Sequence, residues 1–478
     1  MDFKRIFHTL GVVLCFEAML LILPSICAII YDEVAIYSFI ASIVLCLVCG
    51  IPLYLIKPKK NEMYSKEGFV VVALSWILMS LFGALPFVFS EAIPNFIHAF
   101  FETASGFTTT GASILKDVEV IPKSVLFWRS FTHWIGGMGV LVFLMAILSL
   151  SGGSNLHLMR AESTGPAVNK LVPKVKSSAK ILYGIYIGLS LILLVLLLAG
   201  GMSFFEAITH MFGTAGTGGF GIKNSSLADY SPYLQIVITV FMALFGIDFS
   251  VYYLLLLGKF KLMLKSDEVK AYIGIILVST LIISINCVNL FENIWASLRH
   301  SAFQVSSIMT TTGFSTVDFD KFPELSKTIL VLLMFIGACA GSTGGGIKVS
   351  RILIYLKSIK KEISIAAHPK LTKKIQMSGR IVEHETVRSV NVFMAAYIVV
   401  FVLSLLAISI DNLDFTTNFT AVAATLNNIG PGLAKVGPTS NFSVYSDFSI
   451  LVLTFDMLIG RLEVFPILIL FSPYTWKK

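Results

Sequence analysis

Four short stretches rich in Thr, Gly and Asn interrupt a chain that is otherwise strongly apolar, and they recur at roughly even intervals. They consist of Thr108, Thr109, Thr110 and Gly111; Gly216, Thr217, Gly218 and Gly219; Thr310, Thr311, Thr312 and Gly313; and Asn427, Asn428, Ile429 and Gly430. Non-helical backbone at bilayer depth is tolerated only where it is buried in protein or lines a watery cavity. Rings of backbone carbonyl oxygens can replace the hydration shell of a cation. The pattern therefore predicts four segments around one cation pathway, which we call filter segments 1 to 4.

Each filter segment ends in a glycine, namely Gly111, Gly219, Gly313 and Gly430. At such a position the backbone turns a carbonyl toward the axis in a conformation that a β-carbon hinders. A single glycine would favour the alternative of a close-packing site between membrane helices, but four glycines in register favour the filter. Segment 4 carries asparagines in place of threonines and is followed by Pro431, so we expect the ring to be only pseudo-fourfold.

The composition is that of a membrane protein. Of the 478 residues, 56% are hydrophobic and only 13% are charged, and the mean hydropathy of +0.84 lies outside the range of soluble domains. The six cysteines lie in apolar runs and lack the spacing of metal ligands or of a disulfide framework. The first apolar stretch follows Lys4 and Arg5 without a small-residue cleavage site, so we expect a retained helix rather than a signal peptide.

The filter segments need helices to position them, and segments of about 20 apolar residues span a bilayer. The sequence predicts ten such helices, at 8–30, 34–56, 68–90, 124–150, 180–200, 232–257, 271–289, 327–357, 388–410 and 444–472. Shorter apolar segments precede the filter segments and suit re-entrant pore helices, at 94–107, 203–215, 292–309 and 414–427. Counting back from the four glycines places the starts of these helices at Phe96, Phe204, Leu298 and Phe415. Their converging C-termini would stabilise a bare cation through the partial negative charge of the helix dipole.

The predicted fold is therefore an all-α polytopic membrane protein with four pseudo-symmetric helix–pore helix–helix repeats around one pore, plus a two-helix prefix. The expected divisions are the prefix at 1–58, repeat 1 at 59–165, repeat 2 at 166–264, repeat 3 with an intramembrane gate loop at 265–380, and repeat 4 at 381–478.

Lys and Arg concentrate in one set of loops, around 57–66, 160–180, 259–270 and 351–388. The positive-inside rule puts these loops and both termini in the cytoplasm. The net charge of +8 follows from this asymmetry, and we expect no nucleic-acid partner because the sequence offers no basic soluble domain.

These motifs resemble those of the Trk/Ktr/HKT superfamily of potassium transporters, specifically its Trk-type membrane subunit. The resemblance covers essentially the whole chain and rests on the sequences at 105–113, 133–139, 216–220, 309–315, 341–348, 427–432 and 460–463. It implies uptake of K⁺ across the plasma (bacterial inner) membrane, with K⁺ bound at the filter residues and no organic cofactor. It also implies a homodimer and a cytosolic, TrkA-like nucleotide-binding regulatory ring as partner. In this superfamily a serine at the first glycine accompanies sodium preference, so the four glycines imply potassium selectivity.

A small-residue run interrupts the predicted helix at 327–357, and we expect it to form an intramembrane gate beneath the filter. Its members are Gly341, Ser342, Thr343, Gly344, Gly345 and Gly346, followed by Lys348. The alternative is a passive kink that packs against neighbouring helices. For Lys348 two placements stay open, because the side chain could extend to the cytoplasm or contact the gate loop.

Arg461 lies within the last predicted span, where ionisable residues indicate function. The resemblance places it below the filter, where its charge would raise the barrier for a cation. The alternative is a structural ion pair, with Asp456 or a residue of another helix favoured over Glu463, because residues two apart on a helix do not face each other.

The sequence contains no catalytic constellation, so we expect no enzymatic activity in the chain itself. The competing interpretation is the potassium-translocating subunit of a P-type ATPase complex, which uses the same fourfold plan. A carrier with inverted repeats fits less well, because these repeats run in the same direction. Coupling to protons or sodium stays open.

Overall fold

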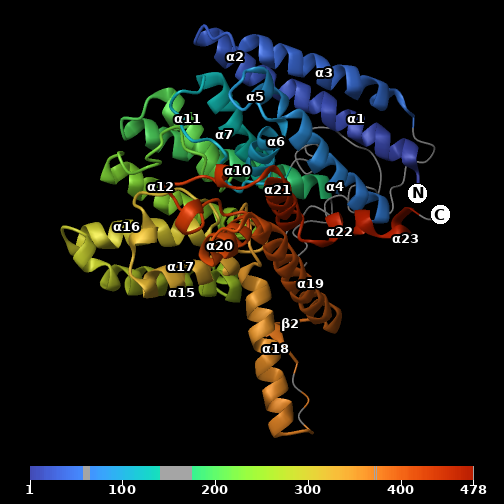
Figure 1. The fold of residues 1–478 in the computed structure, drawn as a ribbon. Coiled ribbons are helices and arrows are strands. Elements are labelled where there is room, and N and C mark those ends of the chain that lie inside the picture. Colours follow the sequence, from blue (N-terminus) through green and yellow to red (C-terminus); the bar gives the residue numbers. More distant parts are fainter. Residues whose placement is uncertain (58–64, 140–174, 371, 373, 477–478) are drawn as a thin grey trace.

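A computed structural model describes residues 1–57, 65–139, 175–370, 372 and 374–476, and these are mostly helical (Figure 1). Within this part of the chain, six helices are long and apolar enough to cross a bilayer, and a bent helix pair is a seventh candidate. The loop predicted at 160–180 lies largely outside the described residues, as do the divisions expected after residues 58 and 165.

The prefix and the first helix of each repeat supply the six continuous spans. The prefix contains α1 (Phe3–Leu20), α2 (Ile22–Ile30) and α3 (Ile36–Leu55). Helices α1 and α3 pack closely because glycines meet backbone: a β-carbon on Gly11 would lie 2.7 Å from the carbonyl oxygen of Gly50. The first helices of the four repeats are α4 (Ser65–Phe82) with α5 (Leu85–Phe89), α10 (Val175–Ala199), α15 (Asp267–Asn286) and α19 (His384–Ile408).

The four pore helices are α6 (Phe96–Phe107), α11 (Phe204–Ala215), α16 (Ile294–Met309) and α20 (Phe415–Leu426). A polar N-cap begins each of them, because its side chain accepts a hydrogen bond from a free N–H of the first turn. These caps are Asn95, Ser203, Asn293 and Asp414. The predicted starts at Phe96, Phe204 and Phe415 are confirmed. The start at Leu298 is wrong by one turn, since Asn293 caps α16 earlier.

In the described residues the second helix of every repeat stops or bends early, and here the predicted bounds of the spans need correction. The span predicted at 124–150 is helical only as α7 (Lys123–Gly137) in its described part, and 140–150 lie outside it. The span at 232–257 divides into α12 (Pro232–Phe245) and α13 (Phe249–Leu256), which are bent by 92°. The other two divide into α17 (Glu324–Ile336) and α18 (Val349–Ala367), and into α21 (Asp447–Arg461) and α22 (Phe465–Phe471).

The backbone conformation shows where these helices end. Gly337 and Val464 have φ angles of +72° and +69°, in the left-handed region that ends a right-handed helix. Gly246 caps α12 at its C-terminus, and Gly139 after α7 has a φ of +79°. Composition alone concealed the breaks, because the residues on both sides remain apolar.

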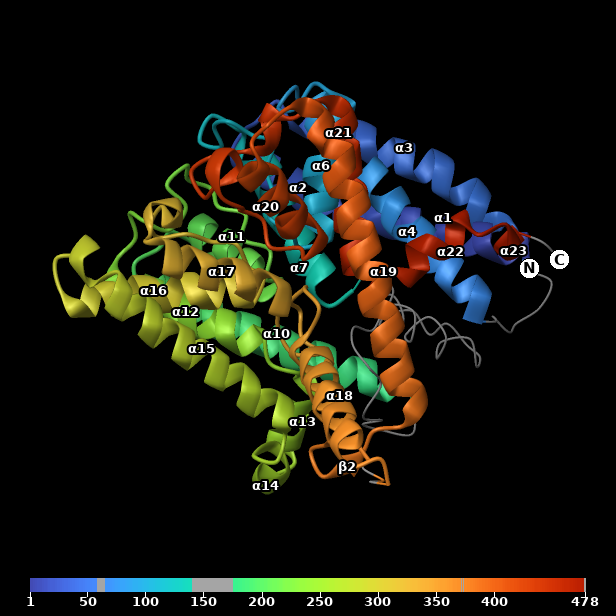
Figure 2. The same cartoon turned by 60° about the horizontal axis from the view of Figure 1, so that its bottom comes forward.

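Helix α18 and the start of α19 project from the body of the molecule (Figures 1 and 2). They are joined by a small antiparallel hairpin of β1 (Gln376–Met377) and β2 (Arg380–Ile381). Its turn residues Ser378 and Gly379 both have positive φ, as a tight hairpin of this twist requires. The remaining helices are short: α14 (Phe260–Met263), α23 (Pro473–Trp476) and the 3₁₀ turns at Val288–Leu290, Phe319–Lys321, Ser409–Asp411, Ala434–Val436 and Phe442–Val444.

Candidate functional site: a four-segment ring and the loop beneath it

All four pore helices end in the same hydrogen-bonded turn. In repeat 1, the N–H of Thr110 donates to the carbonyl of Ser105 at 2.8 Å, and that of Thr109 to Gly106 at 3.1 Å. Repeats 2, 3 and 4 contain the equivalent pair of bonds at the same two distances. This pair defines the Schellman motif. The filter segments therefore leave their helices in one common geometry.

The motif requires a left-handed residue, and this position is seldom filled by threonine. Thr109, Thr217 and Thr311 have φ angles of 54°, 53° and 59°, and Asn428 has 56°. Asparagine tolerates this conformation, whereas a β-branched residue in it is a strained outlier. Strain of this kind persists where the surroundings over-determine the backbone and clusters at functional sites. The same strained threonine conformation recurs in three of the four repeats.

The four final glycines connect the segments into a closed ring. A β-carbon on Gly111 would lie 2.0 Å from the carbonyl oxygen of Gly218, and one on Gly219 would lie 1.9 Å from that of Thr312. Further round, a β-carbon on Gly313 would lie 2.2 Å from the oxygen of Ile429, and one on Gly430 would lie 2.8 Å from that of Thr110. Each glycine thus faces the carbonyl before the next glycine, in the order 1, 2, 3, 4 and back to 1. The structure brings all four predicted filter segments together.

The predicted gate run lies in a loop, residues 337–348, directly against filter segments 3 and 4. A β-carbon on Gly344 would lie 2.8 Å from the carbonyl oxygen of Thr310, and one on Gly345 would lie 2.4 Å from that of Asn427. The N–H of Gly345 donates to Oγ1 of Thr311 at 2.6 Å. Thr311, the threonine of segment 3 with a positive φ, is therefore hydrogen-bonded directly to the loop.

The other residues of the gate run hold the loop in shape. Ser342 Oγ donates to the Cys339 carbonyl at 2.6 Å. The backbone N–H of Thr343 donates to the Phe245 carbonyl at 3.4 Å, and Gly341 and Gly346 have positive φ. Lys348 is buried and its Nζ donates back to the Gly344 carbonyl. Of the two placements open for Lys348, the structure has the contact with the loop.

Arg461 joins three segments that are far apart in the sequence. It is buried at the end of α21, and its Nη1 donates to the Thr343 carbonyl of the loop at 2.8 Å. Its Nη2 donates to the carbonyls of Gly136 and Gly137 at 2.5 and 2.9 Å. These two carbonyls end α7, where the helix dipole favours a cation. Asp456 instead accepts a hydrogen bond from Ser404, and Glu463 forms an ion pair with Arg351.

A link that the sequence did not predict joins the gate loop to the projecting hairpin. Glu268 accepts hydrogen bonds from the N–H groups of Ala340 and Ser350, at 2.7 and 3.0 Å, on the two sides of the gate run 341–346. Its neighbour Asp267 forms an ion pair with Lys357 at 2.8 Å and accepts from the N–H of Ser378 in the hairpin. In the sequence, the only sign of this link is the pair of adjacent acidic residues at the start of a predicted span. Their partners lie far away in the sequence.

The fold is that of an α-helical, multi-pass membrane protein. The family model of the TrkH cation transport proteins matches residues 36–478. The chain therefore belongs to the TrkH family, and it is a transport protein rather than an enzyme. Membership of this family also disfavours the P-type ATPase subunit.

Full-length relatives agree with the family. The chain is 37% identical to the Trk system potassium uptake protein TrkH of Salmonella typhimurium, over 100% of both proteins. It is 32% identical to the Trk system potassium uptake protein TrkG of Escherichia coli, over 98% of both. The crystal structure of the potassium transporter TrkH from Vibrio parahaemolyticus superimposes with a TM-score of 0.90 at 32% identity, covering 100% of both chains.

Proposed function

We propose that this chain takes up potassium across the plasma membrane, in bacteria the inner membrane, through filter segments 1 to 4. The observation that carries the proposal is the closed ring, in which each final glycine faces a carbonyl oxygen of the next segment. Such an arrangement suits a dehydrated cation, because carbonyl oxygens replace its water ligands. Relatives named as potassium uptake proteins make K⁺ the cation to test first.

The surroundings of the ring also suit a cation. The four pore helices end at the ring, and each C-terminus carries roughly half a negative charge. The filter threonines and asparagines are fully buried, so this field acts in a medium of low dielectric constant, where electrostatic interactions are strong. Attraction without a carboxylate favours passage over trapping, because the ion is never bound to a full opposite charge.

We assign residues 341–346 and Lys348 to a gate. The loop contacts segments 3 and 4 from one side, and Arg461 ties it to the end of α7. A cytosolic, TrkA-like nucleotide-binding ring would act on the projecting hairpin, whose link through Asp267 and Glu268 reaches residues on both sides of the gate run. We also propose that the protein is a homodimer and that both of its termini lie in the cytoplasm.

Purified protein in liposomes should pass K⁺ and Rb⁺ down their gradients and disfavour Na⁺ and Li⁺. The reason is the carbonyl ring, whose geometry is fixed by contacts between glycine and backbone. Uptake of radioactive Rb⁺ in competition with each ion measures the preference, and empty liposomes provide the background. Equal Na⁺ and K⁺ flux in the wild-type protein would contradict the proposal.

Arg461→Ala should raise flux moderately, because it removes a positive charge near the pathway and one attachment of the loop. Arg461→Lys separates these two effects, since a lysine keeps the charge but lacks the planar fork that spans three carbonyls. A charge barrier predicts wild-type flux in Arg461→Lys, whereas a mechanical lock predicts flux close to that of Arg461→Ala. Rb⁺ uptake normalised to folded protein distinguishes them, and no increase in Arg461→Ala would remove this residue from the gate.

A further inference from the structure

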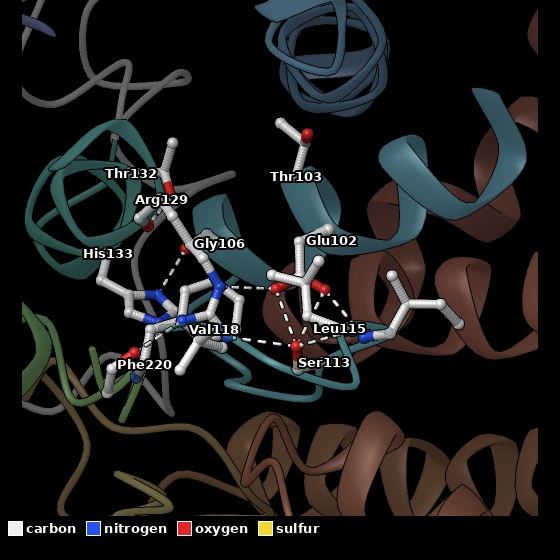
Figure 3. A network of polar contacts seen from close by, with 12 residues as sticks. Glu102, Thr103, Gly106, Ser113, Leu115, Val118, Arg129, Thr132, His133 and Phe220 are labelled. Carbon is white, nitrogen blue, oxygen red and sulfur yellow. Dashed lines mark hydrogen bonds and ion pairs between the residues drawn. The ribbon is translucent and has the colours of Figure 1, made fainter. Parts of the chain in front are cut away.

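A buried ion pair lies behind filter segment 1. Glu102 of the pore helix α6 and Arg129 of α7 meet with Nε and Oε1 2.6 Å apart, and their side chains are 0% and 4% exposed. Glu102 also accepts from the N–H of Ile114 at 2.8 Å and from Oγ of Ser113 at 3.0 Å. Figure 3 shows the carboxylate between the guanidinium and the chain that leaves the filter. The pair therefore holds the chain that directly follows segment 1.

The guanidinium of Arg129 continues this network into repeat 2. Its Nη1 donates to the carbonyl of Gly221 at 2.9 Å, and its Nη2 donates to Oγ of Ser113 at 3.1 Å. Its central carbon lies 3.5 Å from the ring centroid of Phe220. One planar group thus contacts the chain just after Gly111 and the chain just after Gly219, which a lysine could not do at once.

A second link across the same boundary passes through His133, one turn further along α7 (Figure 3). Its Nδ1 lies 2.8 Å from the Gly106 carbonyl, and its Nε2 lies 3.3 Å from the N–H of Phe220. A carbonyl only accepts and an N–H only donates, so the imidazole is neutral with its proton on Nδ1. The ring also fills the space beside Gly218, where a β-carbon would lie 2.3 Å from it.

The other boundaries of the ring are joined differently in the described residues. The chain after segment 2 is linked to the chain after segment 3 by Leu227 N–H and the Ser315 carbonyl at 2.9 Å, and the chain after segment 4 to the chain after segment 1 by Phe442 N–H and the Ser113 carbonyl at 2.9 Å. Between the chains after segments 3 and 4, the Ala434 N–H donates to Oδ1 of Asp320 at 3.2 Å. At the position of Glu102 in the other pore helices stand His210, Gln304 and Ala421. The buried ion pair thus makes the boundary between segments 1 and 2 chemically distinct.

We propose that Glu102, Arg129 and His133 are positioning residues that set segment 2 relative to segment 1 and thereby determine cation discrimination. The proposal rests on the proposed potassium filter. The carbonyls of Thr110 and Gly218 come from these two segments, and their separation decides which dehydrated cation they fit. The ion pair has no net charge, and the N–H groups of Arg129 are bonded to other protein groups. We therefore expect the pair to act by positioning the two segments rather than by an electric field on the cation.

Arg129→Lys tests this inference, because it keeps the charge and removes the fork. We expect the ratio of K⁺ to Na⁺ uptake in liposomes to fall by about tenfold, the loss that 1.4 kcal/mol represents. Ser113→Ala removes only the hydroxyl shared by both partners and should give a smaller fall of about threefold, within the range for one hydrogen bond. The matched control is Glu206→Gln in α11, whose side chain contacts Ser203, Tyr230 and Lys223, none of which belongs to a filter segment.

Thermal unfolding of each variant in K⁺ and in Na⁺ provides a readout that a purely structural role would not produce. The proposal predicts that the additional protection given by K⁺ over Na⁺ shrinks in Arg129→Lys and in Ser113→Ala and is retained in Glu206→Gln. Folded variants that keep the wild-type ratio of K⁺ to Na⁺ uptake would overturn the positioning role proposed for Glu102, Arg129 and His133. A wild-type protein without discrimination would instead overturn the proposed filter. If Arg129→Lys does not fold, Ser113→Ala decides alone.

Discussion

Deletion of Gly341–Gly346 should give high Rb⁺ uptake in the absence of any cytosolic partner. The deletion removes the loop that contacts segments 3 and 4 and the Thr343 carbonyl to which Arg461 is bonded. We expect an increase of about tenfold or more, since every 1.4 kcal/mol taken from a barrier multiplies a rate by ten. The ratio of K⁺ to Na⁺ uptake should stay close to that of the wild type, because the ring carbonyls belong to other segments.

Ser364→Ala is the control for the deletion. The hydroxyl of Ser364 donates to the Lys360 carbonyl within α18, outside the gate run and the filter segments. Uptake by this variant should stay low without the partner. The gate assignment is wrong if the deletion variant folds, as shown by its thermal transition, and still conducts only when the partner is added. The loop would then be a passive kink.

Gly111→Ser and Gly313→Ser should each reduce the preference for K⁺ over Na⁺ by about tenfold or more, a change that corresponds to at least 1.4 kcal/mol. The new β-carbon would lie 2.0 Å from the carbonyl oxygen of Gly218 in the first variant and 2.2 Å from that of Ile429 in the second. No contact this short can persist, so the carbonyl of the next segment must move. Each substitution therefore displaces a carbonyl oxygen of the neighbouring segment, which is segment 2 in Gly111→Ser and segment 4 in Gly313→Ser.

Gly274→Ser controls for the cost of replacing a glycine inside a membrane helix. A β-carbon at Gly274 of α15 meets nothing within 4 Å, so selectivity should be unchanged. Gly430→Ser should reduce the preference for K⁺ less than the other two substitutions, because its β-carbon would lie 2.8 Å from the nearest carbonyl oxygen. Competition between Rb⁺ and Na⁺ in liposomes measures the series. Wild-type selectivity in both Gly111→Ser and Gly313→Ser would remove these residues from the filter.

The sequence by itself determined the repeating parts of this protein. Pore-helix length, polar N-caps such as Asn95 and Asp414, and the final glycines are local features, and each depends on a few neighbouring residues. Hydrophobic segments of spanning length predicted the six continuous helices for the same reason. Local hydrogen bonding also fixes the turn at the end of each pore helix, because its donors and acceptors lie within six residues of chain.

Only the tertiary structure decided how these parts meet. The order of the ring depends on contacts such as that between Gly430 and Thr110, which the chain brings together from opposite ends of its length. Arg461 illustrates the same limit, because its charge predicted a functional role but its carbonyl partners lie in two other repeats. The early ends of the second helices were hidden as well. Apolar composition reports burial in the membrane, whereas a break depends on which backbone groups find partners across the fold.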